Sequence, residues 1–378
     1  MSGWIDVVGE LVARGEDFAA VTVAAVRGST PREPGARMIV TRTATIETIG
    51  GGNLEAACVE RARELLVGDA PVSAQLVRYP LGPGFGQCCG GVATILFERV
   101  AAGRATWLPA LQEYARAGEP CVIVSGAEGC CAGAKLVVAR DAWVGTLGDA
   151  DLDAQAIAQA KTLLDGLGER SRMPRLQALD AAGRTALVLF EPVCPADISI
   201  VLFGAGHVGR ALVDVLAHVD CRVTWVDPRP GEFPSIVPAN THEVIADSPE
   251  LEVDRAPAGA YFLVMTHSHP LDFELCERIL KRGDFAYLGL IGSRPKRNRF
   301  VKYLKREGVT EEALDRMTCP IGVAGVDDKR PATIAIAVAA QLLQVRDATR
   351  HAAQPAASEE SRAESQRTES KAAAPRAG

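Results

Sequence analysis

The spacing of apolar residues along the chain switches repeatedly between the helical and the strand period. In the first half, the predicted elements are a helix over residues 5–14, a strand over 20–26, a hairpin of 37–41 with 45–49, a helix over 54–66 with Asn53 as candidate N-cap, and strands near 72–79 and 92–98. Residues 101–185 are poorly patterned, and no internal repeat of fixed period is evident. The pattern predicts an N-terminal α/β domain over residues 1–195.

The second half has a more regular rhythm, in which short apolar runs alternate with amphipathic helical stretches. The predicted strands are residues 198–203, 222–226, 261–265 and 286–291. Strands that alternate with helices favour a parallel sheet, so the predicted fold class is α/β, with a Rossmann-like, doubly wound domain over residues 196–346. The prolines and polar residues near 191–197 mark the domain boundary. Residues 347–378 are predicted to form a disordered C-terminal tail, because from Ala352 onward they lack large apolar side chains.

Composition narrows the class of partner and the compartment. The 378 residues carry a formal net charge of −6, which argues against a nonspecific nucleic-acid binder. No export signal is visible, and no apolar run approaches the roughly 20 residues of a membrane helix. We therefore expect a cytoplasmic protein with neither nucleic acid nor a membrane as partner. The ten cysteines include no C-x-x-C pair, so zinc-ribbon and thioredoxin-like sites are not expected.

A glycine motif follows the first predicted strand of the second domain. Gly204, Gly206 and Gly209 form G-x-G-x-x-G, in which the first glycine permits a turn, the second lets backbone approach a phosphate, and the third lets helix and strand pack closely. Asp227 ends the next strand, where a carboxylate can accept a hydrogen bond from a ribose hydroxyl. This context predicts a nucleotide-like ligand whose phosphate meets the helix N-terminus. The alternative is a Rossmann scaffold without a ligand.

Three further loops are expected beside this motif, because ligands of open parallel sheets bind outside the carboxyl ends of the strands. The first contains Arg229, and the second contains His267 and His269 in the order H-x-H. A histidine pair without a third ligand is weak support for a metal site, so we expect these side chains to line a pocket.

The third loop leads into a helix with a basic start. Ser293 is the candidate N-cap, and Arg294, Lys296 and Arg297 follow it. Cations at this end of the helix dipole cost about 0.3–1 kcal/mol each, a penalty that a bound anion or an acidic partner would reverse. An anionic site and a structural role for these residues both stay open.

Two cysteine doublets lie in glycine-rich loops. Cys88 and Cys89 stand in GQCCGG, where thiolates can contact a soft metal or sulfur, or where two small side chains simply fill a turn. Cys130 and Cys131 stand in GCCAG, for which we expect loop packing. Another glycine loop, residues 50–52, leads into a predicted helix.

Taken together, these motifs resemble the xanthine dehydrogenase accessory proteins called XdhC, with the related CoxI proteins. The matching segments are GSTPREPGARM, IGGGNLE and GQCCGG in the first half, and FGAGHVGRAL, WVDPR, MTHSHPLD, GLIGSRPKRNRF, CPIG and KRPATIAIAVAAQLL in the second.

The resemblance implies a molybdenum cofactor chaperone that is an accessory factor rather than an enzyme. Such a protein protects the cofactor while a cysteine desulfurase sulfurates it and then delivers it to apo xanthine dehydrogenase, whose molybdenum subunit is the expected partner. The implied cargo is molybdopterin or its dinucleotide form, and assembly as a homodimer stays open. The residues implied to bind the cofactor are Cys88 and Cys89 at its molybdenum, then Gly204, Gly206, His207, Gly209, Asp227, Arg229, His267, Ser293 and Arg294, with Arg32, Gly51 and Gly52 in the first domain.

Two alternatives accompany this interpretation. The glycine motif with Asp227 alone fits an oxidoreductase that uses NAD(P) as cofactor. A scaffold that docks desulfurase and dehydrogenase without holding the cofactor would fit the motif set as well.

Overall fold

The chain divides into two compact units, Met1–Pro195 and Ala196–Gly378. The computed structural model describes residues 3–67, 73–82, 90–166, 173–181, 183–194, 196 and 198–352. Cys88 and Cys89 lie outside the described residues, as does the predicted tail beyond Ala352. Before that point, helix α10 (Pro331–Ala352) continues past residue 346, where the sequence predicted the ordered domain to end.

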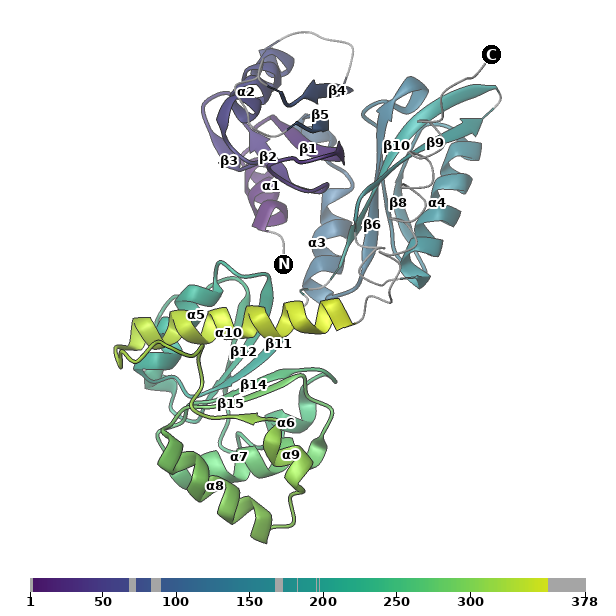
Figure 1. Ribbon diagram of the computed structural model, residues 1–378. Coiled ribbons are helices and arrows are strands. Elements are labelled where there is room, and N and C mark those ends of the chain that lie inside the picture. The colour runs from purple at the N-terminus through teal and green to yellow at the C-terminus, as the bar shows by residue number, and fades with distance from the viewer. Residues whose placement is uncertain are drawn as a thin grey trace, which may run out of the picture. The chain divides into compact units, whose positions relative to one another are not determined.

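The first unit contains two five-stranded antiparallel sheets (Figure 1). The first sheet has the order β3-β2-β1-β5-β4, and the second has the order β8-β7-β6-β10-β9. The elements of the first sheet are α1 (Gly3–Ala13), β1 (Phe18–Arg27), β2 (Arg37–Val40), β3 (Thr45–Glu47), α2 (Gly52–Val67), β4 (Ala74–Pro80) and β5 (Val92–Val100). The elements of the second sheet are α3 (Leu108–Ala117), β6 (Cys121–Glu128), β7 (Lys135–Val138), β8 (Trp143–Thr146), α4 (Ala150–Asp165), β9 (Arg175–Ala181) and β10 (Arg184–Val193).

The segment that looked poorly patterned, residues 101–185, therefore holds most of a complete sheet with two helices. Its central strand β6 is buried along almost its whole length, and such a strand lacks the alternation of polar and apolar residues that marks a half-exposed strand. The predicted N-cap is also corrected, because α2 begins at Gly52 and Asn53 lies within its first turn.

Helices α2 and α4 each cover one face of their own sheet. Leu54, Cys58 and Ala62 of α2 pack on the first sheet, and Leu152 and Ala156 of α4 pack on the second. The opposite faces of the two sheets share a core with α1 and α3. The first unit is thus built around three layers of buried apolar side chains.

The second unit is a six-stranded, wholly parallel sheet with the order β13-β12-β11-β14-β15-β16. Its strands are β11 (Ile198–Phe203), β12 (Cys221–Asp227), β13 (Thr241–Ile245), β14 (Tyr261–Val264), β15 (Tyr287–Leu290) and β16 (Met317–Thr318). Its other helices are α5 (His207–Leu216), α6 (Leu251–Arg255), α7 (His269–Arg282), α8 (Arg294–Arg306) and α9 (Glu311–Asp315). The predicted α/β fold class with a Rossmann-like sheet is confirmed, and β13 and β16 are strands that the sequence pattern did not predict.

The helices of this unit lie on both faces of the sheet (Figure 1). Helices α5 and α10 cover one face, and α6 to α9 cover the other. The chain moves outward from β11 in one direction and from β14 in the other, so the strand order reverses between these two neighbours. In sheets of this kind, ligands bind in the crevice that forms at such a reversal.

Candidate functional site

The glycines of the predicted motif have three different structural roles. Gly204 has a φ of +115°, and a Cβ there would lie 2.4 Å from the carbonyl oxygen of Met265, which follows β14. A Cβ on Gly209 would lie 2.2 Å from the carbonyl oxygen of Gly204, so this glycine lets α5 pack against the loop. Apart from its chain neighbours, a Cβ on Gly206 would meet no atom of the described residues within 4 Å, which leaves open space beside the backbone.

The N-terminus of helix α5 opens into this space. Gly206 is its N-cap residue and offers no side-chain hydrogen bond, and the first turn contains no acidic residue. The exposed His207 begins the helix. The first N–H groups of a helix and its dipole favour an anion, so this position at the reversal point suits a phosphate or carboxylate.

Asp227 is buried and bonded within the protein. One carboxylate oxygen accepts hydrogen bonds from the backbone N–H of Arg229 at 3.0 Å and from its Nε at 2.9 Å. The other accepts from the backbone N–H of Ala205 at 2.7 Å and from Nη2 of Arg229 at 2.9 Å. Burial raises the pKa of Asp227, but the hydrogen bonds from Arg229 and Ala205 outweigh this effect and leave the pKa lowered. Because a carboxylate offers about four acceptor positions, Asp227 is saturated.

Arg229 is the partly exposed member of this pair, with 38% of its side chain accessible. Glu232 accepts a hydrogen bond from its Nη1 at 3.2 Å, and Arg210 of α5 contacts the other carboxylate oxygen of Glu232 at 2.7 Å. The hydrogen bond to Asp227 raises the pKa of Arg229. A fixed guanidinium therefore stands at the end of β12, beside the loop that Asp227 holds.

A second carboxylate, Asp272 of α7, ties the loops on the other side of the reversal point together. It is fully buried and accepts hydrogen bonds from the backbone N–H of Thr266 at 3.2 Å and from its Oγ1 at 2.7 Å. Nζ of Lys296 donates to its other oxygen at 2.8 Å and to the carbonyl of Ile291 at 2.8 Å. Asp272 stands at the end of the motif MTHSHPLD, where no sequence signal predicted a role for it.

This arrangement divides the basic start of α8. Ser293 is its N-cap, and its side chain accepts a hydrogen bond from the backbone N–H of Lys296, in agreement with the prediction. Lys296 is held by Asp272, so it does not add free charge to the site, whereas Arg294 is exposed and Arg297 is half-buried. His267 is exposed, as is His269. Among the described residues, no group of three or more His, Cys, Asp or Glu side chains is arranged to hold a metal ion.

The predicted residues of the second unit thus come from loops that contact one another. Asp227 reaches the loop after β11, Gly204 lies against the loop after β14, and Asp272 joins that loop to the one after β15. The predicted residues Arg32, Gly51 and Gly52 lie in the first unit.

The glycine loop of the first unit is filled by a side chain of its own helix. The carboxylate of Glu55 accepts hydrogen bonds from the backbone N–H groups of Ile49 at 3.0 Å and Gly51 at 3.2 Å, and from Oγ1 of Thr48 at 2.5 Å. Burial raises the pKa of Glu55, but these bonds outweigh it and lower the pKa. The exposed Arg32 lies next to this loop, with Nη1 at 3.5 Å from the carbonyl of Thr48. An internal carboxylate occupies the place that a phosphate would take.

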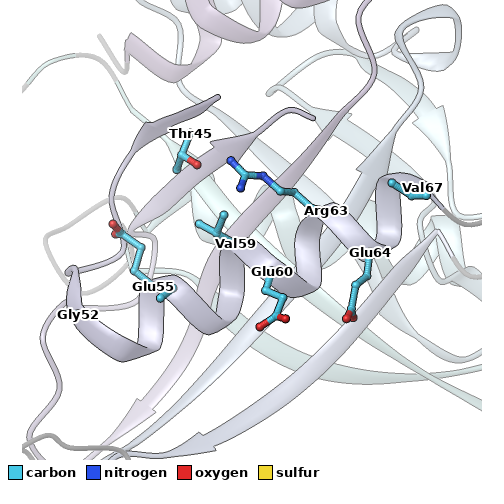
Figure 2. Close-up of a pocket in the computed structure, with 9 residues that line it drawn as sticks. Thr45, Gly52, Glu55, Val59, Glu60, Arg63, Glu64 and Val67 are labelled. Carbon is cyan, nitrogen blue, oxygen red and sulfur yellow. The ribbon is translucent and has the colours of Figure 1, made fainter. Parts of the chain in front are cut away.

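A hollow of about 960 Å³ adjoins this loop between β3 and α2. Figure 2 shows the side chains of Val59 and Arg63 rising from α2 toward the strand of Thr45, whereas Glu60 and Glu64 point away from it. Gly52 and Glu55 line the end nearest the loop.

The described cysteines form no disulfide, and most of them are buried. Burial raises the pKa of Cys58, Cys121 and Cys221 to about 12 each, and it raises the pKa of Cys131 as well. Thiols in this state are poor nucleophiles and poor metal ligands. Cys131 packs near Gly126, as expected for loop packing, while Cys130 is exposed.

Comparison with known proteins finds family matches in both units. A model described as the XdhC Rossmann domain matches residues 200–342, and a model described as the XdhC and CoxI family matches residues 11–80. The chain belongs to the XdhC family. This XdhC-family chain has no described helix that is both long and apolar enough to cross a membrane.

Two known proteins are similar to this chain, one in sequence and one in structure. An uncharacterized protein of Escherichia coli strain K12, YqeB, is 31% identical over 222 residues, which are 56% of this chain and 40% of YqeB. The chain therefore spans about two fifths of the length of the curated relative that it matches. A crystal structure from Bacillus halodurans, described as a xanthine dehydrogenase, has a TM-score of 0.67 at 20% identity and covers 93% of this chain and 98% of its own. At that identity, the likeness concerns the fold.

Proposed function

We propose that this XdhC-family protein is an accessory factor for the maturation of xanthine dehydrogenase, and that it carries the molybdenum cofactor as cargo. The observation that supports this best is the uncapped N-terminus of α5 at the reversal point, with open space beside Gly206. Molybdopterin ends in a phosphate, and its dinucleotide form has a pyrophosphate, so either form offers the anion that this helix end favours. Arg229 after β12 and the exposed Arg294 at the start of α8 would bind further negative charge of the ligand.

In this proposal the protein transfers its cargo rather than turning it over. The described residues bind the phosphate end, Cys88 and Cys89 contact the molybdenum, and release to the dehydrogenase follows when its pocket offers better contacts. The desulfurase that adds sulfur acts on the cofactor while it is held. The saturation of Asp227 favours this role over a nicotinamide-dependent oxidoreductase, because no acceptor position stays open for a ribose diol.

The test compares full-length protein from cells that make molybdopterin with protein from cells that cannot, by mass spectrometry of the released pterin. The key variant is Gly206→Asp, which has room for its side chain and places a good N-cap, yet sets a negative charge where the phosphate would bind. Gly206→Asn is the matched neutral control. We expect bound pterin in the wild type, less in the Asn variant and almost none in the Asp variant.

The absence of pterin from all preparations would contradict the proposal. NADH or NADPH binding at micromolar levels would instead favour the oxidoreductase. If Cys88→Ala with Cys89→Ala left activation of the dehydrogenase unchanged, a docking scaffold would replace the cofactor carrier.

A further inference from the structure

The two sheets of the first unit have the same succession of elements. A helix precedes three strands, a second helix follows, and two strands complete the sheet, first as α1-β1-β2-β3-α2-β4-β5 and then as α3-β6-β7-β8-α4-β9-β10. In space, the first strand of each set is central and pairs with the second and the fifth. The second sheet therefore reproduces the topology of the first.

The sequences of the two sheets align without gaps inside each element. Residues 35–66, GARMIVTRTATIETIGGGNLEAACVERARELL, match residues 133–164, GAKLVVARDAWVGTLGDADLDAQAIAQAKTLL, with more than a third of the positions identical. The strands VATILFERV at 92–100 and TALVLFEPV at 185–193 match as well, as do residues 4–23 and 107–126. The offset between equivalents changes from one segment to the next because the loops differ in length, and this is why no fixed period is visible in the sequence.

The hydrogen bonds repeat along with the residue types. Thr48 donates to the carboxylate of Glu55 at 2.5 Å, and the aligned Thr146 donates to that of Asp153 at 2.6 Å. In both cases the same carboxylate also accepts from the backbone N–H of the residue after the threonine. The helix start filled by a carboxylate thus recurs at the aligned positions of both sheets.

The contact between the two sheets is reciprocal. Arg37 of the first sheet pairs with Glu191 of the second at 2.5 Å, and Lys135, which aligns with Arg37, pairs with Glu98, which aligns with Glu191, at 2.9 Å. All four side chains are less than 10% exposed. An interface in which residue i meets j while the equivalent of j meets the equivalent of i is the mark of a two-fold dimer.

The surroundings of the two cations repeat too. Arg37 donates to the hydroxyl of Thr22 at 2.8 Å, and Lys135 donates to that of Ser125 at 2.9 Å, with the two hydroxyl residues at the same place in the strand ladders. The aligned tryptophans add a cation–π contact in each case. The Cζ of Arg37 lies 4.2 Å from the centroid of the Trp4 ring, and the Nζ of Lys135 lies 5.0 Å from the centroid of the Trp107 ring.

From these observations we infer that residues 4–100 and 107–193 are two copies of one module, and that the first unit is a two-fold dimer built within a single chain. The buried face of the first copy therefore fits the equivalent face of a second copy of the same module. The two-copy architecture is independent of the proposed function, because it does not depend on which ligand the protein binds.

The copies differ in the length of two connections and in a residue beside the hollow. Both connections at one end of the sheet are longer in the first copy, where residues 28–36 and 81–91 stand in place of 129–134 and 182–183. The two long connections meet, since a Cβ on Gly91 would lie 2.3 Å from the carbonyl oxygen of Ser29. The position of Thr45 beside the hollow is taken in the second copy by Trp143, which lies 5.9 Å from the Nζ of Lys161. The first copy thus has the longer connections at this end of its sheet.

The test cuts the peptide connection between the two copies and leaves the rest of the chain unchanged. A protease recognition sequence is inserted into full-length protein between the exposed Gly103 and Arg104, and the cleaved protein is diluted on a sizing column and in a binding titration. We expect the two pieces to elute together at micromolar concentration without denaturant. Arg37→Gln and Lys135→Gln should each weaken their association at least about tenfold, and by factors that agree within about threefold.

The exposed, aligned residues Arg42 and Arg140 provide matched controls, and their Gln variants should leave association unchanged. If a single buried substitution prevents folding, the double change Arg37→Met with Glu191→Met leaves no unpaired buried charge, and its counterpart is made at Lys135 and Glu98. These two doubles should alter association equally. Pieces that separate on dilution, or equivalent variants whose effects differ more than about tenfold, would overturn the inference.

Discussion

The two glycine loops that precede helices differ in what occupies their backbone N–H groups. At residues 50–52 the carboxylate of Glu55 accepts hydrogen bonds from the loop, whereas at Gly206 the helix start has neither a side-chain cap nor an acidic residue in its first turn. A glycine-rich turn before a helix is therefore not sufficient to predict a phosphate site. The residue that decides is an acid in the first helical turn, because it supplies the anion from within.

The most severe way to break the open loop is Gly204→Ala. Its φ of +115° disfavours a side chain, and the new Cβ would lie 2.4 Å from the carbonyl oxygen of Met265. We expect the second unit to lose about 3 kcal/mol of unfolding free energy or more. Urea unfolding measures this through the fluorescence of Trp225, the sole tryptophan of that unit. Gly206→Ala, which has room for its Cβ, should cost less than about 1 kcal/mol, and equal losses would show that the open space is not there.

Asp227→Asn removes the charge that holds both Arg229 and the backbone of Ala205. The loss of charge-assisted hydrogen bonds in a buried place should lower the unfolding free energy by about 2–3 kcal/mol. The same urea experiment measures it. Glu232→Gln, at a partly exposed partner of the same arginine, should cost about 1 kcal/mol or less. A smaller loss at Asp227 than at Glu232 would contradict the role assigned to the buried carboxylate.

Glu55→Ala converts the filled loop into an open one. We expect a loss of about 1 kcal/mol, since the carboxylate satisfies donors at a helix start, and Asp153→Ala should cost a similar amount at the aligned place. Thermal unfolding of the first unit measures both. Added phosphate should raise the melting temperature of the Glu55→Ala variant more than that of the wild type, and an equal response would show that the freed N–H groups do not form an anion site.

The smallest expected effect is on the pH dependence of stability. The folded-state pKa of Asp227 is lowered, so its contribution is present above the unfolded-state pKa of about 3.9 and is lost as the pH falls through the folded-state value. The difference in unfolding free energy between wild type and Asp227→Asn should therefore be constant from about pH 7 to 5 and shrink toward pH 3. A difference that grows on acidification would contradict the lowered pKa.

The second unit was largely predictable from sequence because its signals are local. Glycine spacing located the turn after β11, and Ser293 located the start of α8. The pairing of Asp272 with Lys296 was not predictable in this way, since the two residues are brought together only by the packing of α7 and α8. Glu55 was missed for a related reason, because an acid in a first helical turn usually faces solvent.

The repeat within the first unit could not be predicted from the pattern of apolar residues. A central strand such as β6, buried on both faces, has no alternation to detect, and unequal loops remove any constant period. The shared strand order shows which segments to align, and the pairing of Arg37 with Glu191 and of Lys135 with Glu98 then repeats at aligned positions.

The close approach of Gly204 to the carbonyl oxygen of Met265 means that main chain, and not side chains, forms the contact between the loops after β11 and β14. Substitution of side chains cannot change the spacing of this contact, so if the proposed cargo binds here, discrimination among cargoes would depend on the exposed side chains of the neighbouring loops, such as His267 and Arg294. Because these side chains are exposed, we expect their substitution to change the unfolding free energy of the unit little.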